Sequence, residues 1–387
     1  MTGDYPSAQQ MMAAASDATG LEDFGGSSFL PGLEMMLESL AADVPYAAAD
    51  RDKAIALIER RLVNRLTIEK WFADHCWAAN TSIESPVSIV GLPRTGTTAL
   101  GNLLSLDPQF RSLRAWEQEQ PCPPPHIDTE RDDPRRTAYA HMVETLMRDD
   151  PEQASMHIWE TDASVEDTEV LGLEFHAQQM TMPVWRYHAW WRAEDLRATF
   201  RYHARVARLL QSHRPPNRWL FKAPHHKFHL DHMVDAYPGI RFIFAHRDPG
   251  KSVPSYASFV ASLYPPDVVA KIGREKIGRE IHNHLLTGMR QAMTAREILG
   301  PDHFFDVHHA DFLANPMATL DRIYGWLGLP MSDGLRARFR EWFAGNGSGA
   351  HGAHSYTPEQ YGLSADAIRG DYEFYTRAFG IDTGAKA

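Results

Sequence analysis

The segment Gly91-Leu-Pro-Arg-Thr-Gly-Thr-Thr98 has the residue types and spacing of a loop that binds an anion. Two glycines five residues apart let the backbone turn tightly, so that successive N–H groups can face one anion. A helix expected from Thr97 adds the positive end of its dipole, and Thr97 and Thr98 add hydroxyl donors. Arg94 adds a guanidinium that can bind oxyanions. We therefore predict that Arg94, Thr95, Gly96, Thr97 and Thr98 bind a phosphate-like group.

This loop resembles the nucleotide-binding pattern G-x-x-x-x-G-K-[ST], with Thr97 in place of the lysine. The lysine of that pattern normally reaches the β- and γ-phosphates of a nucleoside triphosphate. Its absence argues against an ordinary kinase or NTPase. A P-loop-type small-molecule kinase and a non-catalytic nucleotide-binding protein are kept as alternatives.

A second candidate anion site lies in His246-Arg-Asp-Pro-Gly-Lys-Ser-Val-Pro-Ser255. Arg247 follows a buried strand, and Ser255 lies eight residues later, about two turns along the expected helix. Both could bind one phosphate, although Arg247 could instead form a structural turn with Asp248. Two anion sites at one sheet edge would suit a cofactor with two separated anionic groups.

The elements that position these residues alternate between strand and helix. Strands are predicted at 85–91, 218–222, 241–246 and 304–308, and helices at 97–106, 224–236 and 252–259. This alternation predicts an α/β fold with a three-layer parallel sheet.

Three further regions surround that sheet. Residues 1–84 are predicted to be an N-terminal helical extension packed on the core, with a helix from Asp50 to Phe72, but residues 1–26 show no sustained period. Residues 85–387 form the main domain, and 126–215 form a helical cap insertion within it. One short helix is expected over 364–379.

These motifs together resemble the sulfotransferase family. Residues 91–98 are similar to its 5′-phosphosulfate loop, especially the bacterial Pro-Arg-Ser-Gly-Thr-Thr form, and Arg247 and Ser255 match its 3′-phosphate site. Trp219-Leu-Phe-Lys-Ala-Pro-His-His226 and His354-Ser-Tyr-Thr-Pro-Glu-Gln-Tyr-Gly-Leu363 are similar to two further blocks. The resemblance implies a P-loop-like sulfotransferase fold. It also implies 3′-phosphoadenosine 5′-phosphosulfate (PAPS) as donor, adenosine 3′,5′-bisphosphate as product, and no metal requirement.

Two residues are candidates for the base that takes a proton from an acceptor hydroxyl. Glu117 follows the loop by roughly twenty residues, and the resemblance to tyrosylprotein-type enzymes implies a basic glutamate near this place. His226 follows Lys222-Ala-Pro, and a histidine titrates near working pH. We rank Glu117 ahead of His226. Lys222 is expected to neutralise charge that develops on the leaving group.

One part of the family pattern differs in this chain. Cytosolic members close the donor site with an Arg-Lys-Gly loop, whereas residues 345–354 contain glycines and two histidines but no Arg or Lys. His354 and Tyr356 are expected to take over part of that role.

Two clusters of residues each allow more than one interpretation, the first as an acceptor pocket and the second as a metal site. Met180, Met182, Trp185, Tyr187, Trp190 and Trp191 suit either an apolar acceptor pocket or a helix-packing core. His225, His229 and His232, at i, i+4 and i+7, could present three imidazoles on one helical face. Because no glutamate sits between them as in His-Glu-x-x-His, no metal is predicted. Asp231 and the pair His308-His309 with Asp311 keep a metallohydrolase as an alternative.

Composition narrows the class of protein and its partners. The chain has 387 residues, two cysteines and a net charge of −11, which argue against a disulfide scaffold and against nucleic-acid binding. It lacks a long apolar run and a signal-peptide pattern, so no stable membrane insertion and a cytoplasmic location are expected. The expected partner is a small, hydrophobic acceptor such as a phenol, sterol or lipid-like alcohol, and a homodimer is left open.

Overall fold

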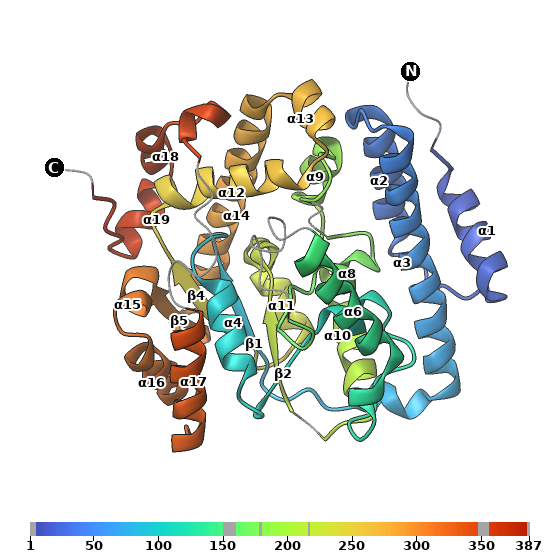
Figure 1. Cartoon of the computed structure of the whole chain (residues 1–387), viewed down its shortest axis with the longest axis horizontal. Coiled ribbons are helices and arrows are strands. Elements are labelled where there is room, and N and C mark those ends of the chain that lie inside the picture. The colour runs from blue at the N-terminus through green and yellow to red at the C-terminus, as the bar shows by residue number, and fades with distance from the viewer. Residues whose placement is uncertain (1–4, 150–159, 178–179, 216, 347–355, 385–387) are drawn as a thin grey trace.

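The computed structural model describes residues 5–149, 160–177, 180–215, 217–346 and 356–384. A parallel sheet forms its centre (Figure 1). Its strands are β1 Val87–Gly91, β2 Phe110–Ser112, β3 Arg218–Lys222, β4 Arg241–His246 and β5 Phe304–His308. They lie in the order β2-β3-β1-β4-β5, and each adjacent pair is parallel.

Helices cover both faces of this sheet. Those of the first half are α1 Ala8–Thr19, α2 Leu30–Asp43, α3 Ala48–Asp74, α4 Thr97–Ser105, α5 Ala115–Glu119, α6 Pro134–Asp149, α8 Thr168–Gly172, α9 Trp185–Trp191 and α10 Arg197–Gln211. Those of the second half are α11 Leu230–Ala236, α12 Pro249–Leu263, α13 Pro266–Ile272, α14 Arg274–Leu299, α15 His309–Ala314, α16 Pro316–Leu327, α17 Asp333–Gly345, α18 Ala365–Asp371 and α19 Glu373–Ala378. The 3₁₀ helices within the described residues are η1 Cys76–Asn80, η2 Glu130–Asp132, η3 Pro224–Phe228, η4 Pro301–His303 and η5 Pro358–Tyr361.

Alternation along the strands divides the core into two layers. Val87 and Ile89 of β1 face α4 and α15–α17, whereas Val90 belongs to the larger cluster with α10–α12 and α14. The same period of two holds in β3, where Leu220 joins the first layer and Phe221 the second. The predicted three-layer α/β sulfotransferase fold is confirmed on this arrangement and on the structural neighbours reported below.

The N-terminal segment begins with a helix that no periodicity in the sequence indicated. Residues 1–26 showed no sustained period, yet α1 forms because Ser7 and Gln10 build a reciprocal capping box at its start. Met11 and Ala15 of α1 are buried. At α3 the N-cap is Ala47, and Asp50 lies in the first turn rather than at the cap.

Two predicted helices are each divided. Residues 224–236 form η3 and then α11, because His229 leaves helical geometry between them. Residues 364–379 form α18 and α19, which are separated at Tyr372. Within the described part of the chain, no helix has the length and apolarity needed to cross a membrane.

Candidate active site

The loop between β1 and α4 has a backbone that few residue types can adopt. Gly91 has φ +145°, and a Cβ there would lie 2.4 Å from the carbonyl oxygen of Ala245 in β4. Arg94 and Gly96 have φ +64° and +88°. The first N–H groups of α4 have no partners inside the helix, so this end can bind an anion.

The threonines of the loop have different surroundings. Thr95 is buried, and its hydroxyl donates to the carbonyl oxygen of Leu92 at 2.7 Å. Thr95 therefore shapes the loop and can offer only its N–H to an anion. Thr97 and Thr98 are half-buried in the first turn of α4.

The two predicted anion sites meet at one edge of the sheet. Arg247 donates through Nη1 to the carbonyl oxygen of Arg94 at 2.5 Å, and Arg94 Nε lies 3.4 Å from Ser255 Oγ. Asp248 caps α12 at Gly250 N and binds Arg369 at 2.8 Å, and it also interacts electrostatically with Arg247. The Arg247 guanidinium itself lies beside the loop.

His309 belongs to the same edge, although sequence reasoning considered the His308-His309 pair only for a metal. A Cβ on Gly96 would lie 3.3 Å from His309 Cδ2. Burial, together with the charges of Arg247 and Lys251, lowers the His309 pKa to about 4. The useful signal in the sequence was its position directly after β5, since ligands of parallel sheets bind beyond the carboxyl ends of strands.

Tyr356 reaches this edge from the C-terminal segment. Its hydroxyl lies 3.4 Å from the carbonyl oxygen of Lys251 in α12. His354, the other residue predicted to replace the Arg-Lys-Gly loop, lies outside the described residues.

Lys222 lies on the other side of the loop, at the end of β3. Its side chain is 2% exposed and packs against α4, where a Cβ on Gly101 would lie 3.1 Å from Lys222 Cδ. Its ammonium lies 3.4 Å from Glu166 Oε1. Sequence reasoning missed Glu166, which lies inside the predicted helical insertion without a recognisable motif.

His226 is fully buried and is part of a chain of polar groups. Its Nδ1 lies 2.9 Å from Ser88 Oγ, and its Nε2 lies 3.0 Å from Asp167 Oδ2. Asp167 Oδ2 also lies 2.9 Å from His203 Nε2, and His203 Nδ1 contacts the Tyr237 hydroxyl. His226 therefore lies between Ser88 and Asp167, and His203 lies between Asp167 and the Tyr237 hydroxyl.

Glu117 is also fully buried, and its partner is Arg111 of β2. Glu117 Oε1 and Oε2 lie 2.7 and 2.6 Å from the Arg111 guanidinium, and Arg114 N donates to Oε1 at 2.9 Å. Burial raises the pKa of this carboxyl, but Arg111, Arg114 and Arg214 outweigh burial, so the pKa lies below its usual value.

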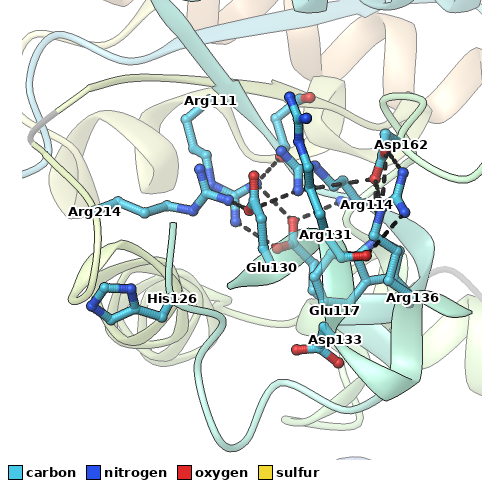
Figure 2. A network of polar contacts seen from close by, with 12 residues as sticks. Arg111, Arg114, Glu117, His126, Glu130, Arg131, Asp133, Arg136, Asp162 and Arg214 are labelled. Carbon is cyan, nitrogen blue, oxygen red and sulfur yellow. Dashed lines mark hydrogen bonds and ion pairs between the residues drawn. The ribbon is translucent and has the colours of Figure 1, made fainter. Parts of the chain in front are cut away.

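Figure 2 shows the arginines that surround Glu117 and Glu130. Glu130 binds Arg114 at 3.0 Å and also contacts Arg214. Burial, then Arg111 and Arg114, lower the Arg214 pKa to about 9, which indicates crowding of positive charge. A polar cavity of about 420 Å³ adjoins this network; it is lined by Arg114, Glu130, Arg131, Arg136 and Asp162.

The histidines and aromatic residues considered for other roles are mainly structural. His225 lies in η3 and His232 in α11, so His225, His229 and His232 do not share one helical face as the spacing had suggested. Within the described residues, no cluster of three or more His, Cys, Asp or Glu side chains could hold a metal.

The aromatic segment follows the packing alternative. Tyr187 and Trp191 are fully buried, and both donate to backbone carbonyl oxygens, at Phe175, Ala177 and His176. Trp190 is half-buried against the same core. These side chains hold α9 in place.

An anion-binding loop, a second arginine and a buried lysine at one edge of a parallel sheet fit a group-transfer enzyme with an anionic substrate. The model of the Sulfotransferase family matches residues 86–333, which is more than half of the chain. The protein therefore belongs to the sulfotransferase family and is an enzyme of that class.

Known relatives agree with this assignment. The omega-hydroxy-beta-dihydromenaquinone-9 sulfotransferases Stf3 of Mycobacterium bovis and Mycobacterium tuberculosis are each 24% identical over 303 residues, covering 72% of this chain and 71% of the relative. The crystal structure of sulfotransferase STF9 from Mycobacterium avium superposes with a TM-score of 0.89 and 27% identity, covering 99% of this chain and all of that one. Sulfotransferase STF1 from M. tuberculosis shares the fold, with a TM-score of 0.82, 24% identity, and coverage of 95% and 99%.

Proposed function

We propose that this sulfotransferase transfers a sulfuryl group from PAPS to a hydroxyl of a small hydrophobic acceptor. The main support for PAPS as the donor is that Arg94, Ser255 and Arg247 lie in contact beyond the ends of β1 and β4. A nucleotide with anionic groups on both its 5′ and 3′ sides could engage the loop and Arg247 together.

In this proposal each part of the site has a distinct task. The N–H groups of the loop, with Arg94, Thr97 and Thr98, hold the 5′-phosphosulfate, while Arg247 and Ser255 hold the 3′-phosphate. Lys222 stabilises the negative charge that grows on the leaving phosphate. Catalysis is then mostly positioning and electrostatic stabilisation, as in phosphoryl transfer.

The acceptor class is supported by the relatives rather than by the aromatic segment, whose side chains are packed. The name of Stf3 describes a hydroxylated lipid quinone as its substrate. A lipid-like alcohol or a phenol is therefore the proposed acceptor. Sulfated products from 2-naphthol, a sterol and farnesol, detected by mass spectrometry, would support it, whereas activity on heparan-type glycans alone would contradict it.

The donor is tested by thermal-shift titration with adenosine 3′,5′-bisphosphate, 5′-AMP, ADP and ATP. Adenosine 3′,5′-bisphosphate should stabilise the protein most, because binding to the folded state raises the melting temperature. Arg247→Ala should weaken its binding about tenfold to a hundredfold, the value of a lost hydrogen bond to a charged group. The same variant should weaken 5′-AMP binding less, because 5′-AMP lacks the 3′-phosphate and loses only the support that Arg247 gives to the loop.

Arg340→Ala, which removes an exposed arginine of α17, is the matched control. Equal stabilisation by ADP and by adenosine 3′,5′-bisphosphate would contradict the proposed donor. A cytoplasmic location and a homodimer stay predictions, and size-exclusion chromatography checks the second.

A further inference from the structure

The carboxylate of Glu166 lies where an acceptor could reach it, unlike the two bases predicted from the sequence. A general base must come within hydrogen-bond distance of the acceptor oxygen. Glu117 is 0% exposed, and both its oxygens bind Arg111. His226 is 0% exposed, with Ser88 and Asp167 at its two ring nitrogens. The Glu166 side chain is 42% exposed.

The backbone on either side of Glu166 is fixed, so its side chain is directed rather than free. Val165 N donates to the carbonyl oxygen of Leu113, the residue directly after β2, at 3.1 Å. Asp167 on the other side is fully buried between His203 and His226. These two attachments hold Glu166 at the sheet edge, between the ends of β2 and β3.

Its position relative to Lys222 places Glu166 beside the predicted sulfuryl group. Glu166 Oε1 lies 3.4 Å from Lys222 Nζ, and the Lys222 stem packs on Gly101 in the second turn of α4. Strand β3 is the neighbour of β1, about 4.8 Å away, and β1 leads into the loop. The carboxylate is thus on the β3 side of the loop, opposite Arg247 at the end of β4.

We propose that Glu166 is the general base that takes the proton from the acceptor hydroxyl, an inference that rests on the proposed function. The acceptor oxygen forms its bond to sulfur while the bond from sulfur to the bridging phosphate oxygen breaks. The proton goes to the Glu166 carboxylate, and the electron pair of the broken bond stays on adenosine 3′,5′-bisphosphate, beside Lys222. Glu117 then acts as a positioning residue for the end of β2, and His226 acts as a positioning residue for Asp167.

The experiment compares Glu166→Gln with the wild type on the acceptor panel described above. General base catalysis contributes about 10²–10⁴-fold, so kcat should fall by that factor. Adenosine 3′,5′-bisphosphate should bind the variant at least as tightly, because a negative charge beside the anion site has been removed. Glu166→Asp, which keeps the carboxylate, should recover part of the rate.

Glu160→Gln, an exposed carboxylate on the same segment, is the matched control and should keep wild-type kcat. Glu117→Gln and His226→Gln are assayed in parallel at a temperature where both are folded. A loss smaller than tenfold in Glu166→Gln, or a larger loss in either parallel variant, overturns the proposal. A wild type that neither binds adenosine 3′,5′-bisphosphate nor yields sulfated product indicates failure of the proposed function itself.

Discussion

Replacement of Glu117 by glutamine should destabilise the whole protein, because it leaves a buried positive charge without its partner. The change keeps the shape of the side chain but removes a carboxylate that binds Arg111 at 2.6 and 2.7 Å. Arg114 and Arg214 lie close by and add positive charge, and the second carboxylate of the cluster, Glu130, already pairs with both of them (Figure 2). Breaking one side of a buried ion pair costs about 3–5 kcal/mol.

That cost can be converted to a melting temperature. An unfolding entropy of about 2.1 cal/mol/K per residue gives roughly 0.8 kcal/mol/K for 387 residues, so the melting temperature should fall by about 4–6 °C. Glu119→Gln is the matched control on the same helix. Glu119 is half-exposed and lies 4.0 Å from Arg60, and such a surface pair contributes less than about 1 kcal/mol.

The effect should depend on pH with a definite sign. The pKa of Glu117 is lower in the folded protein than its usual value of 4.5, so the pair stabilises the fold fully above that pH. The stabilisation is lost as pH falls through the folded-state pKa. Scanning fluorimetry from pH 8 to 3.5 should show a constant difference from the wild type that narrows only below about pH 4.5. A drop no larger than that of Glu119→Gln would refute the reasoning.

Two other predictions use groups outside that cluster. His309 has a pKa of about 4 in the free protein, so it is neutral at pH 7, and a bound anion should raise that pKa. The affinity for adenosine 3′,5′-bisphosphate should therefore rise more between pH 7 and 5 in the wild type than in His309→Gln. If calorimetric titrations showed the same pH dependence of affinity in the wild type and in His309→Gln, His309 would not contact the anion. Cys76 is exposed, whereas Cys122 is buried, and burial raises the Cys122 thiol pKa to about 12. Ellman's reagent at pH 8 should therefore titrate one thiol in the native protein and two after denaturation; two rapid equivalents in the native state would contradict the burial of Cys122.

The sequence predicted the parts of the fold that depend on local patterns. Four of the five strands are apolar runs bounded by Gly, Pro or charged residues, and the loop at 91–98 combines a strand, two glycines and a helix start. Strand β2 has only three residues and includes Arg111, so no period identifies it. Helix α1 was not predicted as a separate element, because its Ala- and Ser-rich sequence has no clear period and its capping box is the one local signal.

The candidate site was predictable where a residue lies at the carboxyl end of a strand or within a few residues after it. Arg94, Lys222 and Arg247 all do so, and parallel strands bring their carboxyl ends to one edge. The burial of Glu117 was not predictable, because its partner Arg111 lies in the strand that no pattern revealed. Glu166 depends on tertiary contacts of Val165 and Asp167, which no local spacing encodes.

The polar chain Ser88–His226–Asp167–His203–Tyr237 joins strand β1 to helix α10, which the sequence assigns to the inserted segment. Replacing one member is therefore expected to leave a buried polar neighbour without its contact. An exchange of the inserted segment would then call for matching changes at Ser88 and His226, which belong to the sheet core.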